Sequence, residues 1–250
     1  MVNLDNSQFA NKKAKCQIDP KSCDNQNERV VILHGATGSY LDLVDLEVAL
    51  VKAGYEVHNW DYPSTTLTIA ECAEYLSQKH ISPTFNKSAQ RTHFVGFSMG
   101  GLVTAEILKN HTPNCLGRVV TLGTPYHGSD ISDYMSRHYL NSKYYNHVFG
   151  PAGQELTTAF RQAALQNVAP LPYELGSIAG NENRLYFVAR NLFNGKENDG
   201  RVSVASTHHP YMKEHLVVLA NHIGLPSHVD AQQATINFLR HGQFDPQPQN

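Results

Sequence analysis

Short apolar runs alternate with amphipathic stretches along most of the chain. The runs are rich in β-branched and aromatic residues, as buried strands are, and they lie at 29–33, 55–60, 91–97, 118–122, 184–189 and 215–220. Between them, apolar positions recur with a helical period and predict helices over 41–53, 68–80, from 102 onward and 228–240. Strands and helices in alternation predict an α/β fold, with a mostly parallel sheet of about six strands and helices on both faces.

The regular alternation stops between residues 126 and 180. This segment holds several tyrosines and one further predicted helix, 155–165. Because it is too long for a simple connection, we expect a cap or lid-like insertion, whose tyrosines either roof an apolar pocket or only cover the sheet. The predicted organisation is a polar tail at 1–28, one domain over 29–244 that includes this insertion, and a short tail at 245–250.

The stretch around Ser98 combines a predicted strand, a sharp turn and a helix. Gly96 and Gly100 stand two positions before and two after the serine, where a tight strand-to-helix turn leaves no room for a side chain. Such a turn raises the serine hydroxyl above the end of the sheet and places the next backbone amide beside it. Since a serine is a poor nucleophile until a base takes its proton, Ser98 is a candidate nucleophile that needs a base.

A candidate base follows the last predicted strand. Ligands of open α/β sheets bind beyond the carboxyl ends of the strands, and His222 lies just after such an end. His222 would take the proton of Ser98 and later give it to the leaving group. His228 is the alternative base, although it falls in the first turn of the last helix if Ser227 and Asp230 form a capping box there.

An acidic residue should orient that histidine. Asp199 lies in an Asn-Asp-Gly sequence after the strand predicted at 184–189, where it would hold His222 and stabilise the imidazolium form. Asn-Asp-Gly is also an ordinary turn composition. Asp61, after an earlier strand, is the alternative acid, and Glu197 is a weaker one.

Backbone amides would complete the predicted site. An oxyanion hole needs N–H donors aimed at developing negative charge. Met99, the residue after the nucleophile, would supply one donor, and Ala36, in the glycine-containing loop after the first strand, would supply the other. We expect the ring of His34, in the same loop, to pack under the site without a necessary role.

Charge and polarity narrow the classes of partner. Lys and Arg number 20 against 22 Asp and Glu, for a net charge of -2, and no basic run favours a nucleic acid or an anionic membrane. No apolar run reaches membrane-spanning length. The polar start of the chain has no apolar signal-peptide core, so we expect a cytoplasmic protein.

The cysteines and histidines form no metal-binding pattern. None of Cys16, Cys23, Cys72 and Cys115 belongs to a Cys-x-x-Cys pair or stands at zinc spacing from histidines. We expect free thiols in a reducing compartment, with a Cys16–Cys23 loop as the alternative. The histidines are scattered, so we expect no metal and no cofactor.

Three motifs resemble those of the α/β-hydrolase superfamily and, within it, of the lipase and esterase branch: Leu33-His34-Gly35, Gly96-Phe97-Ser98-Met99-Gly100-Gly101-Leu102-Val103 and Leu122-Gly123-Thr124-Pro125. Within that branch, the chain most resembles a group of bacterial serine esterases or lipases. The features it shares with that group are Asp-Tyr-Pro-Ser at 61–64, Phe-Gly-Pro-Ala-Gly-Gln-Glu-Leu at 149–156, Asn-Asp-Gly at 198–200 with Val-Ser-Val after it, and Phe-Leu-Arg-His-Gly at 238–242. The resemblance covers about residues 29–244 and implies a catalytic triad of Ser98, Asp199 and His222.

The chain departs from the superfamily pattern in two places. Many lipases continue Gly-Thr-Pro with a histidine, whereas Tyr126 comes first here and His127 follows. The first two strands of the superfamily have no counterpart in the polar residues 1–28, which predicts a reduced sheet.

These observations predict a serine hydrolase that cleaves carboxylic (acyl) esters of short to medium chain length through an acyl-enzyme intermediate. Its partner would be a small-molecule ester. One alternative keeps the site and changes the acceptor, giving an acyltransferase or a thioesterase. The other is a ligand-binding protein on a hydrolase scaffold, against which the complete Ser-Asp-His set argues. The oligomeric state is left open.

Overall fold

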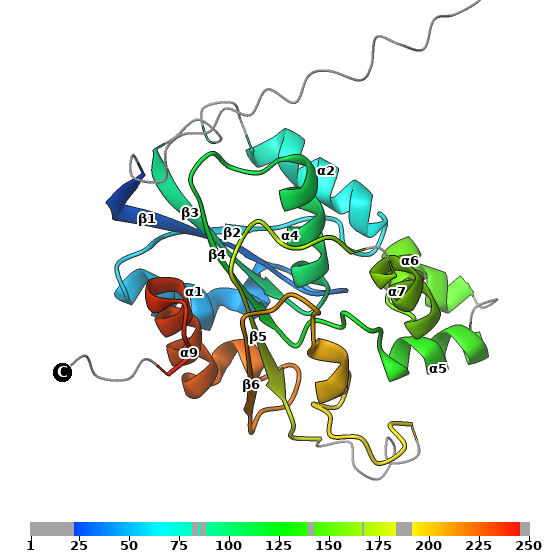
Figure 1. The fold of residues 1–250 in the computed structure, drawn as a ribbon. Helices are drawn as coiled ribbons and strands as arrows, with labels where there is room; N and C mark the ends of the chain where they lie inside the picture. The colour runs from blue at the N-terminus through cyan, green and yellow to red at the C-terminus, as the bar shows by residue number, and fades with distance from the viewer. Residues whose placement is uncertain are drawn as a thin grey trace, which may run out of the picture.

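A computed structural model of the chain describes residues 23–81, 85, 89–139, 143–166, 168–183 and 192–245 (Figure 1). Within these residues the strands form one six-stranded sheet in the order β2-β1-β3-β4-β5-β6, and all neighbours pair in parallel. The strands are β1 (Asp24–Leu33), β2 (Glu56–Trp60), β3 (Gln90–Phe97), β4 (Leu116–Leu122), β5 (Leu175–Gly180) and β6 (Glu214–Val218). The predicted fold class is confirmed.

Helices cover both faces of the sheet (Figure 1). One face carries α1 (Val44–Lys52), which follows the short 3-10 helix η3 (Tyr40–Leu43), and α9 (Val229–His241); the other carries α2 (Ile69–His80) and α4 (Met99–Asn110). Because successive strand side chains point to opposite faces, β1 contributes side chains to two separate hydrophobic cores. Its Val30 and Ile32 pack with the α1 and α9 side, whereas Val31 and Leu33 pack with the α2 and α4 side.

One strand lies where the sequence did not predict it. β5 falls inside the segment expected to be an insertion, and the strand predicted at 184–189 lies outside the described residues. The missed strand consists largely of small residues because its surroundings are crowded: a Cβ added to Gly176 would lie 2.7 Å from Phe244 and 2.9 Å from Phe238. The expected insertion at 126–180 is therefore too long, since its last residues belong to the sheet.

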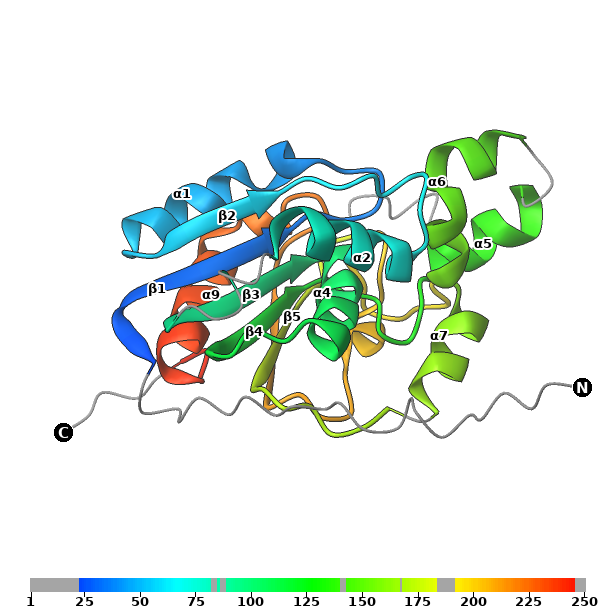
Figure 2. The same ribbon diagram turned by 90° about the horizontal axis from the view of Figure 1, so that it is seen from above.

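The remaining part of that insertion forms a helical cap. Its elements are α5 (Asp130–Tyr139), α6 (Lys143–Glu155) and α7 (Thr158–Leu165), which lie beyond the carboxyl ends of the strands (Figure 2). A Glu155 carboxylate oxygen accepts the Ile69 N–H at 2.7 Å and so joins the cap to the first turn of α2. The Asp133 carboxylate accepts the Thr158 N–H at 2.8 Å and the Thr158 hydroxyl at 2.6 Å, which ties α5 to α7.

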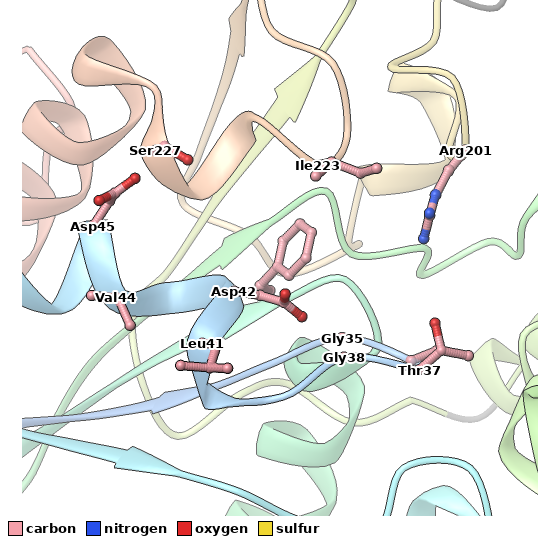
Figure 3. A pocket seen from close by; sticks show the side chains of 12 residues that line it. Gly35, Thr37, Gly38, Leu41, Asp42, Val44, Asp45, Arg201, Ile223 and Ser227 are labelled. Carbon is pink, nitrogen blue, oxygen red and sulfur yellow. The ribbon is translucent and has the colours of Figure 1, made fainter.

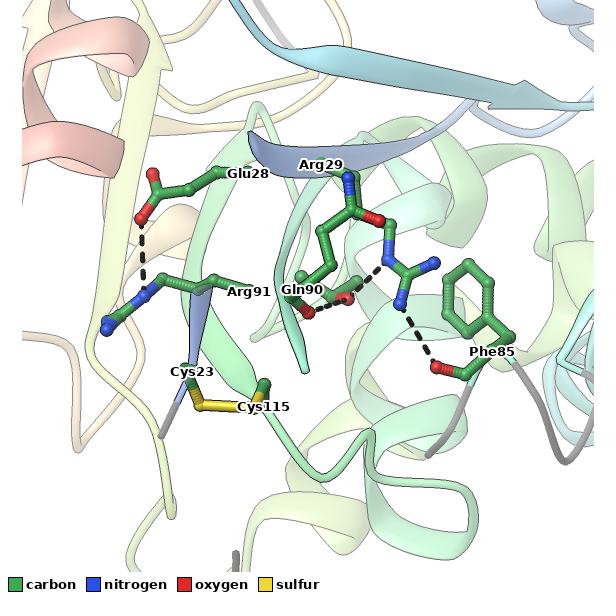
Figure 4. Close-up of a disulfide and its surroundings, with 8 residues drawn as sticks. Cys23, Glu28, Arg29, Phe85, Gln90, Arg91 and Cys115 are labelled. Carbon is green, nitrogen blue, oxygen red and sulfur yellow. Dashed lines mark hydrogen bonds and ion pairs between the residues drawn. A yellow bond between two sulfur atoms is a disulfide. The ribbon is translucent and has the colours of Figure 1, made fainter. Parts of the chain in front are cut away.

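The amino-terminal edge of the sheet differs from the prediction. β1 begins at Asp24, inside the predicted tail at 1–28. Cys23 forms a disulfide with Cys115, with the Cα atoms 5.8 Å apart (Figure 4). The expectation of free thiols is therefore wrong for these two cysteines, as is the Cys16–Cys23 alternative. Cys72 is free and buried.

The capping box predicted from Ser227 and Asp230 is wrong, because Ser227 lies in the 3-10 helix η5 (Leu225–Ser227) and His228 is the N-cap residue of α9, without a side-chain capping bond.

Among the described residues, no helix combines the length and the apolar character needed to cross a membrane.

Candidate functional site

Ser98 occupies a strained turn between β3 and α4. Its φ of 53° and ψ of -124° are unusual for a residue with a side chain. A Cβ at Gly96 would lie 2.4 Å from the Gly101 backbone, and one at Gly100 would lie 2.2 Å from the carbonyl oxygen of Leu33. The two glycines are therefore required by direct backbone contact, as the G-x-S-x-G pattern predicts.

The side chains of Ser98, His222 and Asp199 form a continuous hydrogen-bonded chain. His222 Nε2 lies 3.0 Å from Ser98 Oγ, and His222 Nδ1 lies 2.6 Å from Asp199 Oδ2. All three residues are buried, with exposed fractions of 8%, 3% and 2% for Ser98, His222 and Asp199. These contacts are shielded from bulk water, which strengthens them.

The carboxylate of Asp199 fixes the proton on one histidine nitrogen. Its Oδ1 accepts the backbone N–H groups of Arg201 at 2.9 Å and Val202 at 2.8 Å, which hold its plane. The backbone carbonyl of Asp199 also accepts the backbone N–H of His222 at 2.8 Å. Because an ionised carboxylate only accepts, His222 Nδ1 carries the proton and Nε2 is left to accept the Ser98 hydroxyl.

The alternative site residues lie in other contacts. Asp61 is paired with His34, with 3.0 Å between Oδ1 and Nε2. Glu197 is exposed. His228 stands at the amino end of α9. The structure brings none of these three side chains into the hydrogen bonds around His222.

Solved structures with the same architecture come from several bacteria and metagenomes. A lipase from Bacillus licheniformis, BlEst2 in its mature form, has a TM-score of 0.66 and 22% identity, over 88% of this chain and 94% of that one. The metagenomic carboxyl esterase MGS0156 has a TM-score of 0.64 and 18% identity, over 81% of this chain and 67% of that one. MGS-MChE2, an alpha/beta hydrolase enzyme from a lagoon sediment metagenome, has a TM-score of 0.50 and 16% identity, over 86% and 90%.

The chain has the α/β-hydrolase fold. No protein-family model matches the sequence, and a comparison with curated proteins finds no match. At 16–22% identity, the likeness to these solved structures extends to the fold alone.

In this α/β-hydrolase fold, the loop after β1 lies against the serine. A Cβ added to Gly35 would be 3.0 Å from Ser98 Cβ and 3.4 Å from its Oγ. Ala36 is the next residue in the loop after Gly35. Met99 opens α4, and the first N–H groups of a helix have no partner within it. Both backbone amides remain candidates for the predicted oxyanion hole.

The Gly-Thr-Pro motif after β4 packs against the site residues, a role that sequence reasoning missed. Thr124 is buried, and its hydroxyl donates to the Ser98 carbonyl at 2.8 Å. Gly123 has a φ of 60°, and a Cβ there would lie 3.2 Å from the His222 ring and 3.3 Å from Asp199 Oδ2. The motif followed β4 in the sequence, but only the fold shows that it touches all three candidate residues.

A cleft of about 400 Å³, which we call the rim cleft, opens beside the loop after β1 (Figure 3). It is lined by Gly35, Ala36, Thr37, Gly38, Leu41, Asp42, Val44, Asp45, Phe97, Arg201, Ile223 and Ser227. No tyrosine is among these lining residues, so the roof, one of the two alternatives for the tyrosine-rich segment, is not found over the rim cleft. Tyr126 is instead buried in the core with Ala152 and Leu156, and Tyr134 is exposed on α5.

Over the described residues, no group of three or more histidine, cysteine, aspartate or glutamate side chains is arranged to hold a metal ion.

Proposed function

We propose that the protein is a serine hydrolase that cleaves carboxylic esters through an acyl-enzyme intermediate. The observation that carries the proposal is the chain of contacts from Ser98 Oγ through His222 to Asp199, at 3.0 Å and 2.6 Å. This geometry is that of an activated nucleophile with an oriented base. The lipase and the carboxyl esterase that share the fold support the same class of reaction.

The reaction proceeds in two halves. Ser98 Oγ attacks the ester carbonyl carbon while its proton passes to Nε2 of His222. The bond to the alcohol oxygen then breaks, and His222 returns the proton to that leaving oxygen. Water attacks the acyl-enzyme with the same proton transfers, which releases the carboxylic acid and restores Ser98.

Two backbone amides stabilise the negative charge on the carbonyl oxygen in both halves. We assign these donors to Met99, which follows Ser98 in the chain, and to Ala36, which follows Gly35, the loop residue that lies against Ser98. The loss of one such donor costs roughly 3 kcal/mol of transition-state stabilisation in comparable sites. The substrate class is acyl esters of short to medium chain length.

The proposal is tested by hydrolysis of a 4-nitrophenyl ester series from acetate to palmitate. Wild-type protein should turn over the shorter members, and Ser98→Ala should not. Ser136→Ala, on cap helix α5, is the matched control and should keep full activity. Wild-type protein that neither hydrolyses any ester nor reacts with a fluorophosphonate probe would contradict the proposal and favour a ligand-binding protein on this scaffold.

We also propose that the protein acts in an oxidising compartment. Disulfides persist in such compartments and are rare in the cytosol, so the Cys23–Cys115 bond argues against the cytoplasmic location that the sequence predicted. Alkylation of the protein immediately on lysis of its native cells, followed by mass spectrometry, tests this. Modified Cys23 and Cys115 would contradict it.

A further inference from the structure

The rim cleft borders the proposed catalytic site, although Ser98, His222 and Asp199 are not themselves among its lining residues. Three of its lining residues are near neighbours of those residues in the chain. Phe97 precedes Ser98, Arg201 comes two positions after Asp199, and Ile223 follows His222. Phe97 also contacts the base directly, with its ring centroid 5.0 Å from that of His222. A molecule bound in this cleft would therefore contact residues that adjoin the candidate nucleophile and base.

Arg201 is the only basic residue among those that line the rim cleft. Its backbone is held on both sides, because its N–H donates to Asp199 Oδ1 at 2.9 Å and its carbonyl accepts the Ser129 hydroxyl at 2.8 Å. Figure 3 shows its side chain directed toward the loop that carries Gly35 and Thr37. In the described part of the chain, the Arg201 guanidinium has no hydrogen-bond or ion-pair partner.

Within the described residues, neither acidic residue of the cleft forms an ion pair with Arg201. Asp42 uses Oδ2 to accept the Ser39 N–H at 3.1 Å, as part of the capping box that starts η3. Asp45 lies across the cleft from Arg201, on the side of Ser227 (Figure 3). The rim cleft therefore has a positive end at Arg201 and an apolar section formed by Leu41, Val44, Phe97 and Ile223.

We propose that Arg201 determines substrate specificity by binding a carboxylate carried by the ester, at a position away from the bond that is cleaved. This inference rests on the proposed ester hydrolysis and specifies its substrate class. A guanidinium presents a planar fork of N–H donors that matches a carboxylate with two parallel hydrogen bonds. The substrate is thus an apolar chain or ring with an ester at Ser98 and an anionic end at Arg201.

Matched ester pairs test this selectivity. Mono-4-nitrophenyl glutarate and 4-nitrophenyl pentanoate have acyl groups of equal length and differ in the terminal carboxylate; 4-acetoxybenzoate and phenyl acetate place the same difference on the alcohol side. In at least one pair, Arg201→Gln should lower kcat/KM for the anionic ester about tenfold more than for its neutral partner, through KM. Arg201→Lys should retain part of the preference. Arg137→Gln, which removes a positive charge from α5, should leave kcat/KM unchanged for both esters of each pair. Equal selectivity in wild type and Arg201→Gln for both pairs would overturn the proposal.

A binding measurement separates this proposal from the proposed reaction. Calorimetric titration of Ser98→Ala with the same four esters requires no turnover. The anionic member of one pair should bind Ser98→Ala about tenfold more tightly than it binds Ser98→Ala/Arg201→Gln, with the difference reduced by added salt. If wild type hydrolyses no ester but this difference is found, the reaction is wrong and the anion site stands. If the two proteins bind all four esters equally, the anion site is wrong whatever the activity.

Discussion

The hydroxyl of Tyr62 donates a 2.6 Å hydrogen bond to the backbone carbonyl of His34, and the two rings stack with their centroids 4.2 Å apart. His34 Nδ1 in turn lies 2.9 Å from the Gly35 carbonyl oxygen and donates to it. Both His34 and Tyr62 are buried. Two side chains therefore fix the loop that would present the Ala36 amide, and His34 does more than the packing role expected of it.

Tyr62→Phe should reduce catalysis without weakening substrate binding. The change leaves the His34 carbonyl buried without its partner, which costs about 1–3 kcal/mol, and releases the loop on which the oxyanion hole depends. We expect kcat to fall about tenfold while KM stays unchanged. Steady-state kinetics on a 4-nitrophenyl ester measure both constants. Tyr75→Phe removes a hydroxyl from the surface of α2 and is the control; an equal loss in both variants would contradict the positioning role.

Asp199→Asn should abolish most of the activity while the protein stays folded. An amide at this position no longer holds the proton on His222 Nδ1, so Nε2 loses its role as base. In the well-studied serine protease triad, the corresponding change lowers kcat about 10⁴-fold. Esterase assays over a range of pH values measure the loss. Glu197→Gln, which removes the weaker alternative acid, should be fully active, and the reverse pattern would transfer the role to Glu197.

Reduction of the Cys23–Cys115 bond should destabilise the domain. The two cysteines are 92 residues apart, and release of a loop of that size costs about 4.6 kcal/mol if the bond acts by restricting the unfolded chain. Urea unfolding with and without dithiothreitol measures the difference. The double variant Cys23→Ala/Cys115→Ala should match the reduced protein and no longer respond to dithiothreitol. A wild-type protein whose unfolding midpoint does not change on reduction would contradict the prediction.

Acid should destabilise the protein through two histidines that the fold keeps neutral. Burial lowers the pKa of His209 to about 4, helped by the nearby His127, and burial with the adjacent His208 lowers the pKa of His215 to about 4. The unfolded chain, with histidine pKa values near 6.5, binds more protons between these limits. Stability is therefore complete above about pH 6.5 and falls as the pH drops toward 4.

The two histidines together should account for a loss on the order of 2–4 kcal/mol across that window, allowing for the partial exposure of His215. Urea unfolding at pH 7, 5.5 and 4.5 measures it. His209→Gln and His215→Gln should each flatten the pH dependence, whereas His241→Gln, on the surface of α9, should not. If neither variant changes the slope of unfolding free energy against pH, other groups cause the acid sensitivity.

The local chemistry of the site could be read from the sequence, because short-range sterics dictate it. The turn at Ser98 leaves room only for glycine at positions 96 and 100, so the pattern and its conformation imply each other. The continuous apolar run at 29–33 likewise predicts a strand buried on both faces. His222 and Asp199 could be proposed because parallel strands bring the loops at their carboxyl ends to one rim.

Other features depended on which distant segments meet in space. β5 owes its place to neighbours, since its small residues fit against Phe238 and Phe244 and carry little strand signal of their own. Cys23 and Cys115 are joined because the start of β1 and the segment before β4 lie together, a fact that spacing along the chain does not encode. The same holds for the contact of Thr124 with Ser98. Side chains in such contacts are selected by three-dimensional packing, and only the assembled sheet reveals the partner of each.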